Sequence, residues 1–365
     1  MNQEIQALRA IAIIFVFISH LHGLFFWNED YWNSVGKGLW IGVDLFFCIS
    51  GFVIGKSLIP RLKKSDGILF WREAIAFWIR RLYRITPSAW LWLIIPFMIG
   101  PFLITVKAAT LNSANFADIA SALLHVVNFH YYSCTIGGGF CGIFPTYWSL
   151  SLEEQFYILL PLVFLLFKKH FNSALILLVL AQIFLTRQHW HGISSFIRTD
   201  AILLGVLLSI FFSSENYILF EPNLNKSRFR FFITPVLIFS LVAITRFEIV
   251  QFFIGLAALV CALMVWLCSY DKGYFLKNKL LLSILSWIGA RSFAIYLCHI
   301  PMFWVTREIW AQIEIENFKF DESFTKLFFI TATILTLIIS DLNYRFTEEP
   351  FRKIGKLHAN KLLKK

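Results

Sequence analysis

Several ionisable side chains lie inside long apolar runs, where burying a charge is costly. Arg9 and His20 occur in the first run, Asp44 in the second, and Glu153 and His299 in later ones. Ionisable residues inside membrane-spanning segments either pair with one another or mark a functional site. Histidine and carboxylate side chains can transfer protons near neutral pH. We therefore predict His20, Asp44, Glu153 and His299 as catalytic candidates, with His20 as the general base and a carboxylate orienting its imidazole.

The four catalytic candidates are expected at one depth in the membrane, and Arg9 at another. Arg9 and His20 are eleven residues apart, so they lie on nearly the same face of one helix but about 16 Å apart along it. Counted from the expected helix ends, the four catalytic candidates lie about six to eight residues below the outer surface. The pattern predicts one polar layer in the outer half of a membrane. Buried pairing is the alternative, of Asp44 with Arg9 or Arg291, and His299 is then a hydrogen-bonded core histidine.

Polar residues also recur at helical spacing. Ser149, Glu153 and Tyr157 share one helix face, and Tyr296 and His299 share another. Such stripes point polar groups towards the interior of a bundle. We predict that Ser149, Tyr157 and Tyr296 contact a substrate.

A group of arginines is expected near the opposite, cytoplasmic surface. It comprises Arg9, Arg80, Arg81, Arg84, Arg291 and Arg352, of which the first four are the main candidates to bind phosphate. Arginines at this depth commonly anchor a helix end, whereas several that converge on a cavity suit phosphate groups. The residues alone leave both interpretations open.

The elements that must position these residues are membrane-spanning helices. Of the 365 residues, 58% are hydrophobic and only 15% are charged, which is too apolar for a soluble globule. Apolar runs of about 18 residues or more recur, and helices satisfy their backbone groups in lipid. We predict an all-α polytopic membrane bundle of about ten transmembrane helices. The expected spans are roughly 5–27, 36–59, 84–106, 147–167, 173–188, 196–213, 231–246, 249–269, 283–306 and 324–342.

The positive charge indicates topology. The net charge is +11. Most lysines and arginines fall in the segments between helices that lie on the same side of the membrane as the N-terminus, and the positive-inside rule identifies that side as the cytoplasm. We therefore predict two cytoplasmic termini and no nucleic-acid partner. Residues 1–345 form the expected transmembrane domain and residues 346–365 a basic cytoplasmic tail.

The cysteines carry no metal signal, and we predict no metal site. Four of the six lie in apolar runs, where a thiol is usually a small hydrophobe. Cys134 and Cys141 share one loop, and they can pair if that loop faces an oxidising compartment. The sequence leaves this disulfide open.

Together these residues resemble acyltransferase family 3, membrane proteins that modify bacterial surface glycans. The family signature of an arginine and a histidine separated by ten residues is matched by Arg9 and His20. Further motifs follow in family order: GVDLFFCISGF at 42–52, FWIRR at 77–81 with Arg84 and Pro87, WSLSLEEQFY at 148–157, RTDA at 198–201 with Gly205, Ser292 to Tyr296, His299 and Pro301, and EPFR at 349–352.

The resemblance implies an enzyme of the bacterial inner membrane. It implies transfer of an acyl group, usually acetyl, from cytoplasmic acyl-CoA to a hydroxyl of a surface glycan or lipid-linked saccharide. Acyl-CoA is then a co-substrate, with no tightly bound cofactor, and its phosphates meet the cytoplasmic arginines. Arg198 and Asp200, inside a matched motif, are expected to bind substrate.

Alternatives remain at three levels. Ser151 and Cys298 depart from the residue types that the family pattern leads us to expect, and this affects packing. The fused extracytoplasmic domain of some members is not found, so any second catalytic unit is expected in trans.

The transfer step can pass through a covalent intermediate, either an acyl-histidine or an acyl-serine at Ser50 or Ser149. The acyl group can be succinyl. A polysaccharide or lipid-linked-sugar transporter is the competing class, and a non-catalytic scaffold ranks below it.

Overall fold

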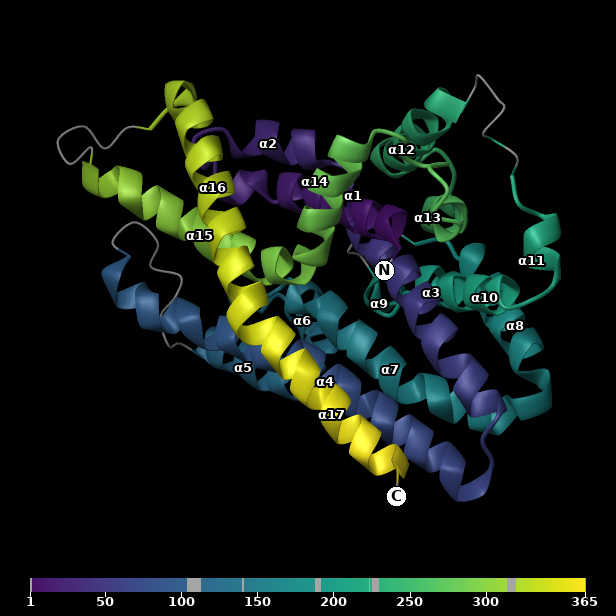
Figure 1. The fold of residues 1–365 in the computed structure, drawn as a ribbon. Helices are drawn as coiled ribbons and strands as arrows, with labels where there is room; N and C mark the ends of the chain where they lie inside the picture. Colours follow the sequence, from purple (N-terminus) through teal and green to yellow (C-terminus); the bar gives the residue numbers. More distant parts are fainter. Residues whose placement is uncertain are drawn as a thin grey trace. The chain divides into compact units, whose positions relative to one another are not determined.

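A computed structural model describes residues 2–103, 113–139, 141–187, 192–222, 224, 230–313 and 320–364 (Figure 1). In these ranges every regular element is a helix, which confirms the predicted all-α class. The chain divides into two compact units. Unit 1 comprises Met1–Val16, Lys37–Ala74 and Ile158–Ser292, and unit 2 comprises Phe17–Gly36, Ile75–Tyr157 and Phe293–Lys365.

Unit 1 is organised around two tightly packed helices, α3 (Gly42–Lys63) and α10 (Asp200–Phe212). A Cβ atom on Gly51 would lie 2.0 Å from the Ile202 carbonyl oxygen, and one on Gly205 would lie 2.1 Å from the Cys48 carbonyl oxygen. No other residue type permits this approach without a shift of the backbone. The two helices lie side by side in Figure 1. Their first turns carry the carboxylates of Asp44 and Asp200.

The other helices of unit 1 pack around this pair. A third apolar helix, α13, contacts α3, α10 and its neighbour α12, and α8 contacts α10. Their bounds are α8 (Phe171–Ile183), α9 (Ile193–Phe196), α11 (Asn216–Leu219), α12 (Arg230–Phe247), α13 (Phe253–Ser269) and α14 (Lys279–Ala290). Three further helices run from one unit into the other: α1 (Gln3–Ser19), α4 (Gly67–Ile99) and α7 (Tyr147–Phe167).

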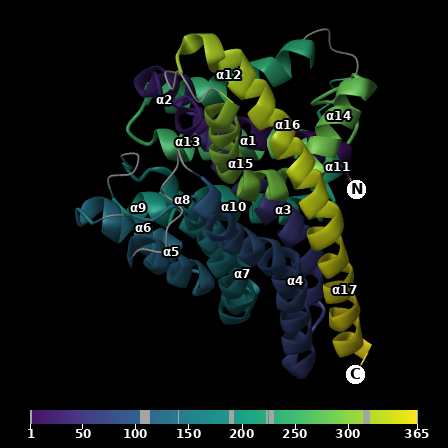
Figure 2. The ribbon, with the colours of Figure 1, turned by 90° about the vertical axis from the view of Figure 1, so that its left-hand side faces the viewer.

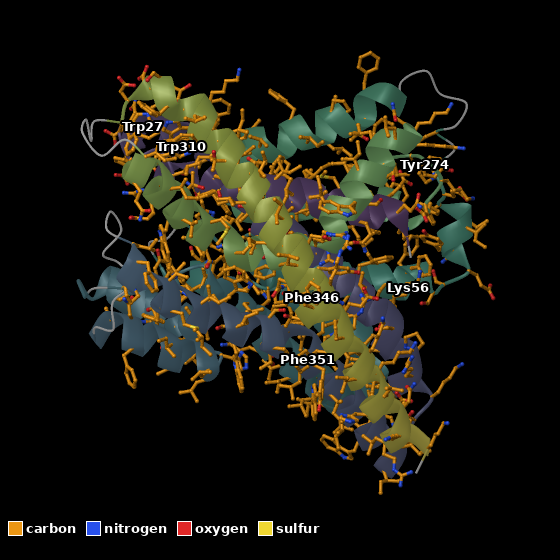
Figure 3. The ribbon with its side chains drawn as sticks, turned by 60° about the vertical axis from the view of Figure 1, so that its left-hand side comes forward. Trp27, Lys56, Tyr274, Trp310, Phe346 and Phe351 are labelled. Atoms are coloured by element: carbon orange, nitrogen blue, oxygen red, sulfur yellow. A yellow bond between two sulfur atoms is a disulfide. The ribbon has the colours of Figure 1, made fainter. Side chains whose placement is uncertain are left out.

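Unit 2 has an aromatic core beside the residues that follow α1. Phe25, Phe303 and Phe328 are buried together in it, and Trp27 and Trp310 pack against it from the same end of the unit (Figure 3). The core joins the chain after α1 to α15 and α16. The helices of unit 2 are α2 (Glu29–Gly36), α5 (Ser113–Leu123), α6 (Val127–Ile136), α15 (Ser292–Ile313), α16 (Thr325–Asn343) and α17 (Glu349–Lys364).

The C-terminal segment is one long helical rod. A π-helical turn, Tyr344–Glu348, joins α16 directly to α17, as Figure 2 shows in yellow. Within unit 2, α17 packs on α4, because Gly355 leaves room for Tyr83, whose Cβ is 2.5 Å from an ideal Cβ at that glycine. His358 Nδ1 lies 3.0 Å from the Tyr83 hydroxyl. The predicted basic tail is therefore a docked helix.

Four helical segments among the described residues are long and apolar enough to cross a membrane: Leu39–Lys63, Gly67–Phe102, Tyr147–Ile183 and Glu322–Lys364. The pair α14 and α15 satisfies the same criteria together, while α10, α13 and Phe232–Phe247 are apolar but shorter.

Two boundaries and one additional helix differ from those expected, and the expected span 283–306 is broken at Arg291 into α14 and α15. The first helix ends at Ser19 rather than near residue 27, and an unexpected helix α2 follows. Helix α4 begins at Gly67, well before residue 84, because the Arg and Glu residues of its first half lower hydropathy while favouring helix.

Candidate functional site

His20 stands at a break in the chain rather than within a helix. It follows the last residue of α1, and its backbone has left the helical conformation before the short 3₁₀ turn Leu21–Gly23. Its imidazole is partly exposed, whereas that of His299, on α15, is completely buried. His299 Nε2 lies 3.4 Å from His20 Nδ1, and the ring centroids are 5.1 Å apart. Two members of the predicted polar layer therefore meet.

The hydrogen bonds of His299 assign the tautomers of both rings. His299 Nδ1 lies 2.8 Å from the Tyr296 carbonyl oxygen and 3.2 Å from that of Ile295. Carbonyl oxygens only accept, so Nδ1 of this histidine carries the proton and its Nε2 carries a lone pair. His20 Nδ1 lies 3.4 Å from this nitrogen and also 3.4 Å from Ser19 Oγ, and both atoms can accept from one Nδ1–H group. The network leaves His20 Nε2 with a lone pair, which is what a general base needs.

A second polar chain lies one turn away on α15. The Tyr296 hydroxyl donates to the Thr146 carbonyl oxygen at 2.7 Å and lies 2.6 Å from Ser149 Oγ. Ser149 Oγ also lies 3.3 Å from the Thr146 carbonyl oxygen, so both hydroxyls reach this carbonyl and either of them can donate to the other. The rings of Tyr296 and His299 are 6.1 Å apart. Ser149 and Tyr296, both predicted to contact substrate, thus lie beside the histidine pair.

Glu153 and Tyr157 form a third group with the arginines of α4. The Tyr157 hydroxyl donates to the Glu153 carboxylate. The guanidinium carbon of Arg81 lies 5.2 Å from the centroid of the Tyr157 ring, a distance at which a cation and a ring attract. Trp78 Nε1 donates to the Tyr157 carbonyl oxygen at 3.0 Å, which ties α4 to α7.

The same group gathers the other predicted phosphate ligands of α4. Arg80, Arg84 and Glu153 are all close enough to Arg81 to interact with it electrostatically. Arg80 and Arg84 are partly exposed. Glu154 also interacts electrostatically with Arg81. Three arginines beside two carboxyl groups retain a surplus of positive charge, which suits an anionic group.

Asp44 is an ion-pair partner, and the predicted partners were wrong. Its carboxylate accepts from Arg198 Nε at 2.8 Å and Nη2 at 3.0 Å, within unit 1. Both side chains are almost completely buried. We expected Asp44 to orient His20 or to pair with Arg9 or Arg291. Instead the orienting position on His20 is occupied by His299, and the Arg291 guanidinium stacks on Trp287 at 4.0 Å.

Arg198 and Asp200, expected to bind substrate, are both buried in unit 1. Arg198 Nη1 donates to the Ser195 carbonyl oxygen at 2.8 Å, so the guanidinium is held by its own unit. Asp200 pairs with Arg187 at 3.0 Å. Arg9, on α1, is partly exposed. The substrate-binding roles of Arg198 and Asp200 and the donor-binding role of Arg9 stay predictions.

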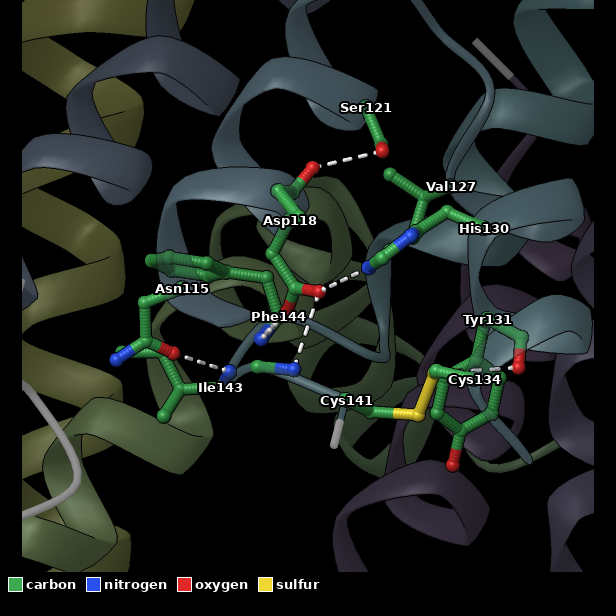
Figure 4. Close-up of polar contacts among 12 residues, drawn as sticks. Asn115, Asp118, Ser121, Val127, His130, Tyr131, Cys134, Cys141, Ile143 and Phe144 are labelled. Atoms are coloured by element: carbon green, nitrogen blue, oxygen red, sulfur yellow. Dashed lines mark hydrogen bonds and ion pairs between the residues drawn. A yellow bond between two sulfur atoms is a disulfide. The ribbon is translucent and has the colours of Figure 1, made fainter. Parts of the chain in front are cut away.

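A clamp that sequence reasoning missed holds the segment before α7 (Figure 4). Asp118 on α5 pairs with His130 Nε2 at 2.9 Å and accepts the backbone N–H groups of Gly142 at 3.2 Å and Phe144 at 2.8 Å. Cys134 and Cys141 form the disulfide that the sequence left open. Nothing in the local sequence of His130 indicates its partner Asp118, which lies twelve residues earlier.

The clamp positions part of the site. Segment 141–144, which the clamp holds, lies just before Thr146 in the chain, and the Thr146 carbonyl oxygen accepts the hydrogen bond of the Tyr296 hydroxyl. Among the described residues no group of three or more His, Cys, Asp or Glu side chains is arranged to hold a metal ion.

Comparison with known proteins gives a consistent set of relatives. A sequence model described as an acyltransferase domain matches residues 2–345. The peptidoglycan O-acetyltransferase of Listeria monocytogenes is 27% identical over 375 residues, which cover 96% of this chain and 56% of the relative. A Bacillus subtilis protein provisionally named a peptidoglycan O-acetyltransferase is 26% identical over 376 residues, covering 96% of this chain and 55% of that protein.

A Staphylococcus aureus protein with a provisional O-acetyltransferase name is 26% identical over 398 residues, covering 96% of this chain and 57% of that protein. The chain therefore spans about half the length of the curated relatives it matches. No solved structure matches it.

Proposed function

We propose, from the premise that the chain belongs to acyltransferase family 3, that it moves an acetyl group from acetyl-CoA to a hydroxyl of a cell-wall glycan. The observation that carries the proposal is the His20–His299 pair, because its hydrogen bonds leave a basic nitrogen on His20. The relatives named as O-acetyltransferases of peptidoglycan supply the acyl group and the acceptor class.

His20 performs the proton transfer in this proposal. Its Nε2 takes the proton of the acceptor hydroxyl as the hydroxyl oxygen attacks the thioester carbonyl. The C–O bond forms, the C–S bond breaks, and the electron pair leaves with the sulfur of CoA. The proton on His20 then passes to that thiolate, which restores the base. A positioned base of this kind typically contributes about 10²- to 10⁴-fold in rate.

The other groups of unit 2 position the substrates. Ser149 Oγ, which lies between the Tyr296 hydroxyl and the Thr146 carbonyl oxygen, accepts a hydrogen bond from an acceptor hydroxyl. Arg80, Arg81 and Arg84 bind phosphates of the donor, with Glu153 and Tyr157 fixing Arg81. Arg9 retains its predicted role in donor use. Direct transfer is preferred to an acyl-serine, because Ser149 is bonded to a tyrosine and not to a base.

The topology completes the proposal. Acetyl-CoA is cytoplasmic and the glycan lies outside the bacterial inner membrane, so the chain must present the two substrates from opposite sides. We propose about ten spans with both termini in the cytoplasm, on the distribution of lysine and arginine. Reporter fusions after residues 30 and 365 test it: opposite locations support the proposal, and identical ones contradict it.

Mass spectrometry of the cell-surface glycan tests the proposed reaction. Cells with the protein should carry glycan heavier by one acetyl group per modified sugar than cells without it. A heavier group of succinyl mass would replace acetyl in the proposal. Unchanged glycan in both strains would contradict acyl transfer and favour the transporter class.

A further inference from the structure

Unit 1 contains two buried ion pairs that differ in how completely they are satisfied. Asp44 and Arg198 make two aligned hydrogen bonds, and the Arg198 guanidinium also lies over the Trp40 ring at 5.2 Å. Arg187 and Asp200 make a single contact at 3.0 Å between Nη2 and Oδ2. The pair of Asp44 and Arg198 therefore shows how many hydrogen bonds a buried ion pair of this unit can make, and the pair of Arg187 and Asp200 makes fewer.

The second pair leaves buried polar atoms unsatisfied. Within the part of the chain that the structure describes, Arg187 Nε and Nη1 and both carboxylate oxygens of Asp200 have no hydrogen-bond partner. The side chains of Arg187 and Asp200 are 1% and 0% exposed. Leaving one buried donor or acceptor unsatisfied costs about 1–3 kcal/mol, and more for a charged group. Asp200 Oδ2 keeps its ion-pair contact with Arg187, and a protein rarely retains the other three such atoms unless something else satisfies them.

The charge of the group indicates what that occupant is. The field of Arg187 and Asp200 reaches Asp44, which Arg198 already neutralises. Two arginines and two aspartates sum to zero, so this group does not favour an anion such as a phosphate or a carboxylate. Two N–H groups of Arg187 beside the carboxylate of Asp200 instead match a neutral ligand that both accepts and donates, such as neighbouring hydroxyls or an acetamido group of a sugar.

We propose that Arg187 and Asp200 form a glycan-binding subsite of unit 1 for neutral hydroxyl or acetamido groups. The proposal rests on the proposed function for the choice of a glycan, and it assigns a role to Arg187, which the sequence did not single out. Gln182 fixes the arginine, since its backbone carbonyl oxygen accepts from Arg187 Nη2. The side chain of the same glutamine accepts from the Thr199 backbone N–H at 3.0 Å, which holds the start of α10.

The test is sugar binding by the full-length protein in lipid nanodiscs, without an acyl donor. The probe is chitotetraose, a neutral oligomer of N-acetylglucosamine, and the readouts are its dissociation constant and the rise it causes in the thermal midpoint. The double variant Arg187→Met with Asp200→Leu should fold, because apolar replacement of a buried ion pair is often neutral or stabilising. It should bind chitotetraose about 10- to 100-fold more weakly than the wild type.

Two controls make the result decisive. Lys37→Met removes an exposed charge of the same unit and should leave binding unchanged. Arg187→Lys keeps the charge but loses the planar fork of donors, so it should also weaken binding of chitotetraose. This variant replaces the double variant in the comparison if the double variant does not fold. Wild-type affinity in either Arg187 variant overturns the proposal, as does a wild type that binds no sugar or is displaced from it by inorganic phosphate.

The outcome is separable from the proposed function. If the wild type transfers acetyl but the Arg187 variants bind the sugar as tightly as the wild type does, only the proposed subsite is overturned. Arg187-dependent sugar binding without any acetyl transfer overturns the proposed reaction alone.

Discussion

His299 Nε2 lies 3.4 Å from His20 Nδ1, although the two residues are 279 positions apart in the chain. Since His299 Nδ1 is committed to backbone carbonyl oxygens, the buried histidine can only accept from its partner. One fixed histidine thereby orients another and sets which nitrogen is basic. This relationship resembles the orienting partner of a catalytic histidine in other enzymes, with an imidazole in place of a carboxylate.

Replacement of His299 by phenylalanine should impair the chemical step. Phenylalanine keeps a ring in the core but cannot accept from His20 Nδ1–H, so the basic tautomer is no longer selected. We expect kcat to fall about 10²-fold or more, while the KM for acetyl-CoA stays within about twofold. Steady-state kinetics of the purified protein measure both. An equal rise in KM with unchanged kcat would assign His299 to substrate binding instead.

Replacement of Arg84 by glutamine should weaken donor binding. One phosphate contact of an arginine contributes about 1.5–3 kcal/mol, so the KM for acetyl-CoA should rise at least about tenfold. Arg61→Gln is the control, because Arg61 is exposed and lies 3.7 Å from Glu73.

The phosphate-free donor S-acetylpantetheine makes this prediction specific. If the arginines of α4 bind phosphate, Arg84→Gln and the wild type should use S-acetylpantetheine equally poorly. A variant that loses the same factor with both donors would show that Arg84 supports the fold or the acceptor.

The disulfide clamp should stabilise unit 2 and the site it carries. Cys134 and Cys141 close a loop with a sequence separation of 7, and the chain-entropy model gives roughly 2–3 kcal/mol for such a loop. Cys134→Ser with Cys141→Ser should lower the thermal midpoint and the transfer rate together. Reductant should produce the same drop in the wild type and none in the double variant. A reductant effect of equal size in both proteins would contradict this account.

Helix α10 should tolerate no side chain at Gly205. An alanine Cβ would lie 2.1 Å from the Cys48 carbonyl oxygen, so we expect Gly205→Ala to destabilise unit 1 by about 1–3 kcal/mol, despite the better helix propensity of alanine. Gly23→Ala is the matched control, since no atom of the described residues lies within 4 Å of its ideal Cβ. Thermal unfolding in detergent compares them, and equal midpoints would contradict the packing of α3 and α10.

The sequence predicted those parts of the site that depend on spacing within one helix. Glu153 and Tyr157 are one turn apart and do meet, and Tyr296 and His299 do share a face. Counting depth along two expected spans also brought His20 and His299 to the same level, and the structure joins them. The helical class followed from composition, because only helices satisfy long apolar runs in lipid.

Partners far apart in sequence could not be predicted. Asp44 and Arg198 are 154 positions apart, and their pairing depends on how α3 packs against α10. Periodicity identifies a buried face but not the helix that covers it. For the same reason, periodicity could not predict that Asp118 pairs with His130 or that Arg187 pairs with Asp200.

The central claim is that His20 is the base of an acetyl transfer, and transfer by the purified protein in proteoliposomes tests it most directly. Labelled acetyl-CoA is supplied on one side and a peptidoglycan fragment on the other, with His20→Ala compared against the wild type and the neighbouring variant His22→Ala. The wild type and His22→Ala should label the glycan at similar rates, and His20→Ala should be about 10²- to 10⁴-fold slower while inserting normally. Labelling by His20→Ala at the wild-type rate would contradict the account.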